Sequence, residues 1–112
     1  MSVLLTKYFR FSASHGVGKK IYGHNYVLGV TTRALALGDE KRFEEAVEEG
    51  LIRHLESRDL GLHVDFLKNI PITDENLLNV FWKILSKKIK PVKLYSLSLD
   101  RDSRTRTMLA KP

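Results

Sequence analysis

The sequence predicts an α+β fold in which two helices cover one face of a four-stranded antiparallel sheet. Apolar and polar residues alternate in segments at both ends of the chain, as they do in half-buried strands. Between these segments, apolar residues recur at the spacing of amphipathic helices. The 112 residues contain no repeat, linker or low-complexity tract, so we expect one domain over residues 1–112.

The strand segments are rich in β-branched, aromatic and aliphatic residues, which suit a pleated, half-buried surface. The expected strands are residues 3–12, 26–37, 92–100 and 104–110. The first two would pair as a hairpin around a loop at 15–20, and Gly29 indicates a bulge or a close approach in the second. Because such a sheet has open edges and a partly apolar second face, we expect a homo-oligomer.

Two helices should lie between the two pairs of strands. Asp39 is the expected cap of a helix that runs to about Leu55, with apolar residues on one face and glutamates on the other. Thr73 is the expected cap of a second helix, whose first turn carries two acidic residues that suit the helix dipole. Pro91 should end it.

Composition excludes several classes of protein. No apolar run approaches the roughly 18 residues of a membrane span, and the N-terminus lacks a signal-peptide pattern, so we expect a cytoplasmic protein. The absence of cysteine excludes disulfides, thiolate metal sites and a cysteine nucleophile. A net charge of +6 favours anionic ligands, yet the arginines at 101, 104 and 106 belong to no recognised nucleic-acid module, so nucleic acid is a disfavoured partner.

Two of the four histidines are placed to meet. His15 follows the first expected strand and His24 precedes the second, so the hairpin brings both to one end of the sheet. Neutral imidazoles are good zinc ligands, and rigid strand ends would hold them in position. The alternative interpretation is a pair of hydrogen-bonded loop histidines without a metal.

Four short motifs extend this observation over most of the chain. They are FSASH at 11–15, YGHNY at 22–26, LESRDLG at 55–61 and ITDENLL at 72–78. Together with the order of strands and helices, they resemble the 6-pyruvoyl tetrahydropterin synthase family, which includes the 6-carboxytetrahydropterin synthases. The corresponding family motifs read F-x-A-x-H, H-G-H-N-Y, L-D-H-x-x-L-N and P-T-x-E-N-L-A. The chain looks like a short, divergent member.

The resemblance implies a tunnelling fold, in which three subunits close their sheets into a barrel and two trimers commonly stack as a hexamer. It implies an active site between subunits, where three histidines hold zinc and the zinc binds the side-chain hydroxyls of 7,8-dihydroneopterin triphosphate. In such enzymes a cysteine acts as general base, an Asp–His pair assists proton transfer, and a glutamate late in the chain anchors the pterin ring.

The metal-binding positions are carried over in part. By resemblance, His15 and His24 are two of the three ligands, and Tyr22 occupies the third position. A phenol with a pKa near 10 is a weak ligand at neutral pH unless the metal lowers that pKa. Water or His63 are the alternatives for the third place.

The catalytic positions are carried over less completely. Glu56 and Ser57 stand where the family has its Asp–His pair, so Glu56 is the candidate catalytic residue. The segment expected to hold the cysteine has Lys19 and Lys20 but no thiol. The candidate substrate-binding residues are Thr73, Glu75 and Asp100, of which Asp100 stands at the position of the family glutamate.

Two functions remain open at this level. The first is a zinc-dependent enzyme that converts a dihydropterin triphosphate or a related purine-derived substrate by side-chain elimination. The second is a catalytically degenerate member that binds a pterin-like ligand or a partner without turnover. Removing a general base typically costs about 10²–10⁴ in rate, so the missing cysteine and histidine favour the second. The family resemblance favours the first, which is the function we expect, with the second as the alternative.

Overall fold

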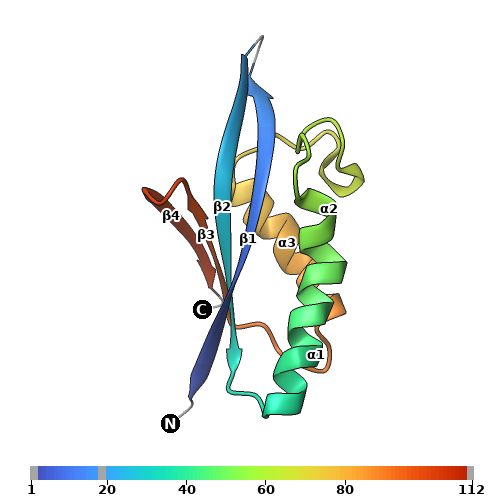
Figure 1. The fold of residues 1–112 in the computed structure, drawn as a ribbon, viewed down its shortest axis with the longest axis vertical. Helices are drawn as coiled ribbons and strands as arrows, with labels where there is room; N and C mark the ends of the chain where they lie inside the picture. The colour runs from blue at the N-terminus through green and yellow to red at the C-terminus, as the bar shows by residue number, and fades with distance from the viewer. Residues whose placement is uncertain (1–2, 18–19, 111–112) are drawn as a thin grey trace.

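A computed structural model describes residues 3–17 and 20–110. The elements in chain order are β1 (Leu4–Val17), β2 (Lys20–Arg33), α1 (Leu37–Val47), a π-helical segment (Glu48–Ile52), α2 (Arg53–Leu55), a short 3-10 helix (Asp65–Leu67), α3 (Asp74–Lys88), β3 (Ser96–Arg101) and β4 (Thr105–Ala110). The strands form one antiparallel sheet in the order β1-β2-β3-β4, and the helices lie on one side of it (Figure 1). The predicted α+β fold is confirmed.

The β1–β2 hairpin is longer than the sequence predicts. Each strand has 14 residues, and the pairs run without interruption from Leu4↔Arg33 to Val17↔Lys20. The expected loop at 15–20 was therefore too long, and the expected start of the second strand at residue 26 was too late. Main-chain pairing depends little on side-chain polarity, so Gly16 and Lys20 did not end the strands. His15 and His24 consequently lie within strands.

The first helical stretch is continuous from α1 through the π-helical segment to α2, and it ends at Leu55 as predicted. It starts one turn before the expected cap: Ala36 is the N-cap, and its carbonyl accepts from the main-chain N–H of Asp39 at 2.9 Å. At Gly50, an added Cβ would lie 3.0 Å from the Cγ of Lys88. This glycine thus lets α3 pack closely against the π-helical segment.

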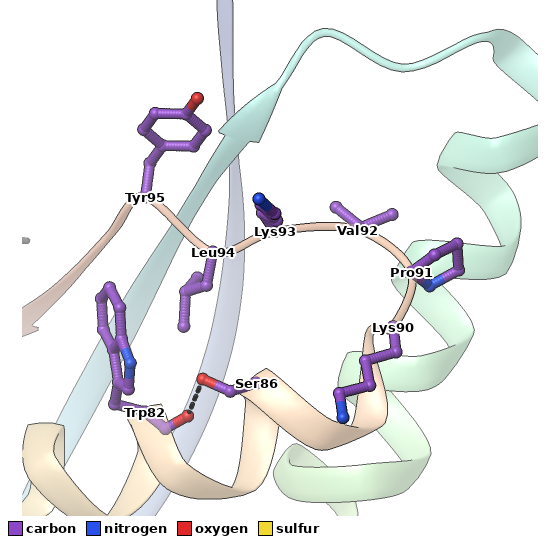
Figure 2. A pocket seen from close by; sticks show the side chains of 8 residues that line it. All are labelled: Trp82, Ser86, Lys90, Pro91, Val92, Lys93, Leu94 and Tyr95. Carbon is purple, nitrogen blue, oxygen red and sulfur yellow. Dashed lines mark hydrogen bonds between the residues drawn. The ribbon is translucent and has the colours of Figure 1, made fainter.

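The second helix, α3, begins where the sequence indicates. The Thr73 hydroxyl oxygen accepts from the main-chain N–H of Asn76 at 3.2 Å, which satisfies one of the free donors of the first turn. The helix ends before Pro91, and residues 90–95 then arch across its C-terminal turns (Figure 2). Because this segment crosses α3, β3 starts at Ser96 and not at residue 92 as predicted.

The hydrophobic core lies between the sheet and the helices. Its largest fully buried side chains include Tyr26 and Leu28 of β2, Phe81 of α3, and Leu97 and Leu99 of β3. On the opposite face, the side chains are small or polar near the centre, and Tyr8 and Met108 are more than half exposed, at 55% and 62%. The strand period of two assigns His15, Tyr22 and His24 to the helix-covered face.

Gly29 marks a close approach and not a bulge, since the β2 register continues through it. A Cβ at this position would lie 2.4 Å from the Ser98 Oγ and 3.3 Å from a ring carbon of Tyr8. Within residues 3–17 and 20–110, no helix is long and apolar enough to cross a membrane.

Candidate metal and ligand site

A cavity of about 530 Å³ lies where the half of the β1–β2 hairpin nearer its turn meets the start of α3. It is lined by His15, Tyr22, His24, Tyr26, Ile72, Thr73, Asp74 and Arg101. The hairpin supplies the histidines and tyrosines, the approach to α3 supplies the next three residues, and the end of β3 supplies the arginine. Segments far apart in the sequence thus form one site.

The two histidines are held together by strand register. His15 is paired with Tyr22 and Ala13 with His24, so His15 and His24 are diagonal neighbours on adjacent strands. Their rings are stacked, with centroids 5.1 Å apart and planes inclined by 26°. The hairpin therefore brings the two imidazoles together as the sequence predicted, although from within the strands and not from their ends.

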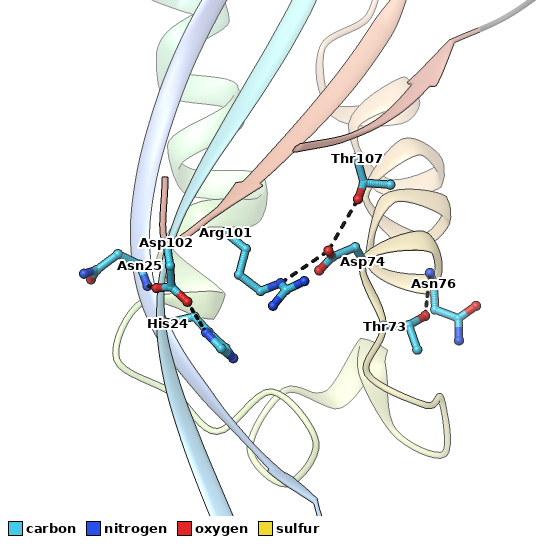
Figure 3. A network of polar contacts seen from close by, with 8 residues as sticks. All are labelled: His24, Asn25, Thr73, Asp74, Asn76, Arg101, Asp102 and Thr107. Atoms are coloured by element: carbon cyan, nitrogen blue, oxygen red, sulfur yellow. Dashed lines mark hydrogen bonds and ion pairs between the residues drawn. The ribbon is translucent and has the colours of Figure 1, made fainter. Parts of the chain in front are cut away.

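Asp102 orients His24. Its Oδ2 lies 2.5 Å from the His24 Nδ1, and its Oδ1 accepts from the main-chain N–H of Asn25 at 3.0 Å (Figure 3). These two hydrogen bonds, first that from Asn25 and then that from His24, lower the pKa of the Asp102 carboxyl group, so it is ionised at neutral pH. An ionised acceptor keeps the proton of a neutral imidazole on Nδ1 and leaves Nε2 unprotonated.

His15 carries a buried nitrogen without a partner. Its Nδ1 makes no hydrogen bond to any of the described residues. Burial is the main cause that lowers the pKa of His15, and the neighbouring His24 and Arg101 lower it further. His15 is consequently neutral at pH 7, the form in which imidazole binds metals. A buried polar atom without a partner has lost its hydration, and a bound cation would compensate for that loss.

A second polar pair forms the opposite wall. The Arg101 Nε donates to the Asp74 Oδ2 at 3.3 Å, and the Thr107 hydroxyl donates to the same oxygen at 3.4 Å (Figure 3). His24 and Arg101 both point from the sheet toward the start of α3. Burial is the main cause that raises the pKa of the neighbouring Tyr26 to about 12, so this phenol stays protonated.

The charges of this site favour a cation. Two carboxylates, Asp74 and Asp102, face one permanent cation, Arg101, when both imidazoles are neutral. Together with the unpartnered Nδ1 of His15, this arrangement fits a divalent metal held by two imidazoles, one of them supported by a carboxylate. Among the described residues, no group of three His, Asp or Glu side chains is placed to hold a metal, so His63 does not complete the pair.

The other predicted residues are divided between this cavity and the rest of the surface. Tyr22 and Thr73 line the cavity, and the Tyr22 ring centroid lies 6.1 Å from that of His15. Glu75 is exposed on α3 and is not part of the lining. Lys20 is exposed at the start of β2, whereas Lys19 lies outside the described residues.

Glu56 and Asp100 lie away from the two histidines. The Glu56 Oε2 accepts from the main-chain N–H of Ser12 at 3.1 Å, so this carboxylate lies at the outer edge of β1. Asp100 faces the side of the sheet that the helices do not cover, where its two oxygens accept from the Arg106 Nε and Nη2 at 2.7 and 2.9 Å. The structure does not bring either residue together with His15 and His24.

The sequence does not identify Ile72 or four polar residues that line or support the site: Tyr26, Asp74, Arg101 and Asp102. From the sequence alone, Tyr26 is expected in a strand and Asp74 in the first turn of a helix. The arginines at 101 and 106 are close in sequence, but β-strand alternation places them on opposite faces of the sheet. A strict count of the strand period from Leu97 and Leu99 would have assigned Arg101 to the helix-covered face.

Comparisons with known proteins agree with this arrangement. A search of curated proteins finds no significant match. Among solved structures, the fold is similar to that of 6-pyruvoyl tetrahydropterin synthase from Caenorhabditis elegans, with a TM-score of 0.85 and 18% identity over 98% of this chain and 96% of the other. It is also similar to an uncharacterized protein from Wolinella succinogenes, with a TM-score of 0.68 and 14% identity over 100% and 99% of the two chains.

Identities this low show a shared fold only, whereas a match to a family model also rests on the residues at each position. Residues 4–111 match the model of 6-pyruvoyl tetrahydropterin synthase. That match covers nearly the whole chain and includes both histidines and the start of α3. The chain belongs to the 6-pyruvoyl tetrahydropterin synthase family.

Proposed function

We propose that this protein binds zinc through His15 and His24 and converts a dihydropterin triphosphate-type substrate by side-chain elimination. The observation that carries the proposal is the stacked histidine pair at one wall of a cavity, with Asp102 on His24 and an unpartnered nitrogen on His15. Family membership supports the pterin as the substrate class. The bound metal would polarise the side-chain hydroxyls and so acidify the neighbouring C–H bond.

The protein's own residues would hold and orient the substrate. Asp74 presents a carboxylate whose Oδ1 has no hydrogen bond among the described residues, and such a group pairs well with the adjacent N–H donors of a pterin ring. Tyr26, with a pKa of about 12, stays protonated at neutral pH, so its hydroxyl can donate a hydrogen bond to the substrate. Thr73 stands at the cavity wall, and its hydroxyl hydrogen is free to reach a ring acceptor.

A homo-oligomer would complete this site. Among the described strands only β2 pairs with β1, and the segment at 57–60 covers the Ser12 to Ser14 part of its outer edge. The outer edge of β4 has no strand partner within the described residues. We propose that these edges pair between copies as a trimer or a hexamer, which would also bring Glu56 of one copy toward a neighbour.

Metal analysis tests the first step. Protein purified without added metal should contain zinc near one ion per chain, and H15A and H24A should each lose it. The exposed His54 gives a matched control, because H54A should keep its zinc. Equal metal contents in all four proteins would contradict the proposed site.

Turnover tests the second step. Zinc-loaded protein should release inorganic triphosphate from 7,8-dihydroneopterin triphosphate, and the H15A/H24A double variant should not. If zinc-loaded protein releases none, the elimination is not its reaction.

A specific observation favours the second candidate function, which is binding without turnover. The cavity lining contains no thiol, and Glu56 lies on the edge of β1 away from it. That function predicts that a dihydropterin raises the melting temperature of the zinc-loaded protein while no product forms. If the dihydropterin raises the melting temperature of D74N as much as that of the wild type, Asp74 does not bind the pterin ring.

A further inference from the structure

A second cavity, of about 690 Å³, lies at the other end of α3 from the histidine site. It is lined by Trp82, Ser86, Lys90, Pro91, Val92, Lys93, Leu94 and Tyr95. Along α3, Asp74 of the histidine site lies 8 residues before Trp82 and 12 before Ser86, or roughly 12 and 18 Å at 1.5 Å per residue. None of the residues that line the first cavity also lines this one.

The walls of this cavity are mostly apolar and are fixed by the fold. Residues 90–95 arch over the C-terminal turns of α3, and Leu94 points down toward Trp82 and Ser86 (Figure 2). Leu94 is buried, at 8% exposure, so it cannot swing away without opening the core. The Ser86 hydroxyl donates to the Trp82 carbonyl at 2.6 Å, and its oxygen remains available as an acceptor.

Tyr95 is also held in place at the edge of the cavity. Its main-chain N–H donates to the Thr31 carbonyl at 2.8 Å, and its hydroxyl accepts from the Arg33 Nε at 2.8 Å. The Arg33 guanidinium carbon lies 5.9 Å from the centre of the Tyr95 ring. A smaller cavity of about 450 Å³, lined by Arg33, Leu35, Pro91, Val92, Lys93 and Tyr95, adjoins the 690 Å³ cavity through four shared residues.

The charged side chains that line these two cavities are all positive. The two cavities present Lys90, Lys93 and Arg33, and none of the described Asp or Glu side chains lines either of them. Lys90 and Lys93 form no ion pair with any of the described residues. Pockets that bind small molecules typically have about 300–1,000 Å³, apolar and aromatic walls and a few charged groups, which is the pattern seen here.

We infer that this cavity is a binding site for a small organic anion with a flat, apolar body. The body would lie against Trp82, Val92 and Leu94, and the anionic group would meet the ammonium groups of Lys90 and Lys93 at the rim. The site is independent of the metal and of the proposed elimination, so it would act as a second ligand site on the same chain.

Trp82 makes the inference directly measurable, because it is the single tryptophan of the chain and lines the cavity. The probe is 8-anilinonaphthalene-1-sulfonate, an aromatic anion that accepts excitation energy from tryptophan. Titrating it into the folded, full-length protein should quench the Trp82 emission and give sensitised probe emission with a saturable binding curve. The neutral N-phenyl-1-naphthylamine has nearly the same ring system without the sulfonate, and it should bind more weakly.

The charge variant is K90Q/K93Q, and K41Q/K68Q is its matched control. All four lysines are exposed, so neither double variant disturbs the core. K90Q/K93Q should weaken binding of the anionic probe by about tenfold and leave that of the neutral probe unchanged, whereas K41Q/K68Q should change neither. Added salt should weaken binding of the anion to the wild type more than to K90Q/K93Q.

Three results would overturn the inference. Unquenched Trp82 emission at saturating probe would mean that the probe does not enter this cavity. Equal affinities for the wild type and K90Q/K93Q would mean that the lysines do not recognise the anion. If the affinity for the probe decreases as the protein concentration is raised and larger assemblies form, another copy of the chain fills the cavity.

Discussion

His24 and Asp102 are 78 positions apart in the chain, yet the imidazole Nδ1 and the carboxylate Oδ2 lie 2.5 Å from one another. The contact depends on the turn between β3 and β4, where Asp102 has a φ of 54° and its main-chain N–H donates to the Asn25 carbonyl at 2.9 Å. Aspartate adopts this left-handed conformation more readily than most residues. The turn thus aims a carboxylate at one of the two histidines.

We expect D102N to lower zinc affinity about 10-fold to 100-fold, the usual effect of removing a carboxylate that supports a metal-bound histidine. An amide can still accept the hydrogen bond from Asn25, so the turn should keep its shape. Competition with a chromogenic chelator measures the affinity. D39N, which changes an exposed carboxylate at the start of α1, serves as the control, and equal affinities for D102N and D39N would contradict the role assigned to Asp102.

Y22H should raise zinc affinity, because it adds a third imidazole directly across the strand pair from His15. Structural zinc sites with four ligands bind with about 10–16 kcal/mol, or about 3 kcal/mol per ligand, which corresponds to roughly 100-fold in affinity. Y22F is the matched control, since it removes the phenol without adding a nitrogen. If Y22H and Y22F bind zinc equally, position 22 does not face the metal.

Much of the fold was predictable because local signals and packing agree. The predicted cap, Thr73, is the residue that caps α3 in the structure. The alternation around Phe9 and Phe11 also predicts the buried face of β1 correctly. The ends of the hairpin were not predictable, because glycines and lysines are compatible with a paired strand as well as with a loop. Pairing between strands decides such segments, and a single sequence does not contain that information.

The site was only partly predictable, for a related reason. His15 and His24 could be found because a hairpin brings near neighbours together. Asp74 and Arg101 reach the cavity, and Asp102 reaches His24, through contacts distant in sequence. Asp100 and Arg101 show how strongly the face that a side chain occupies depends on its position in the strand. A one-residue change of position along a strand reverses the face, so the carboxylate lies outside and the guanidinium lies in the cavity.

The stability of the metal-free protein should fall as the pH is lowered from about 6.5. Burial lowers the pKa of His15 below its model-peptide value of 6.5, so the unfolded chain takes up a proton at a higher pH than the folded chain does. The stability contributed by the neutral His15 is therefore complete above pH 6.5 and is lost as the pH falls toward the folded-state pKa. Urea unfolding with a chelator present measures this slope.

The same slope can be assigned to one residue by substitution. H15Q should flatten the pH dependence below 6.5, because glutamine does not titrate. H54Q removes an exposed histidine and should leave the slope as it is in the wild type. A slope unchanged in H15Q would assign the proton uptake to another group.

Gly29 should tolerate substitution poorly although it lies in the middle of a strand, where alanine is ordinarily preferred to glycine. A Cβ there would lie 2.4 Å from the Ser98 Oγ, so the serine must rotate and the neighbouring Tyr8 ring must shift. We expect G29A to reduce the free energy of unfolding by about 1–2 kcal/mol. The matched control is G23A in the same strand, where an added Cβ meets no atom within 4 Å. The double variant G29A/S98G should recover most of the loss, and equal stabilities of G29A and G23A would mean that the two strands do not approach as closely as this.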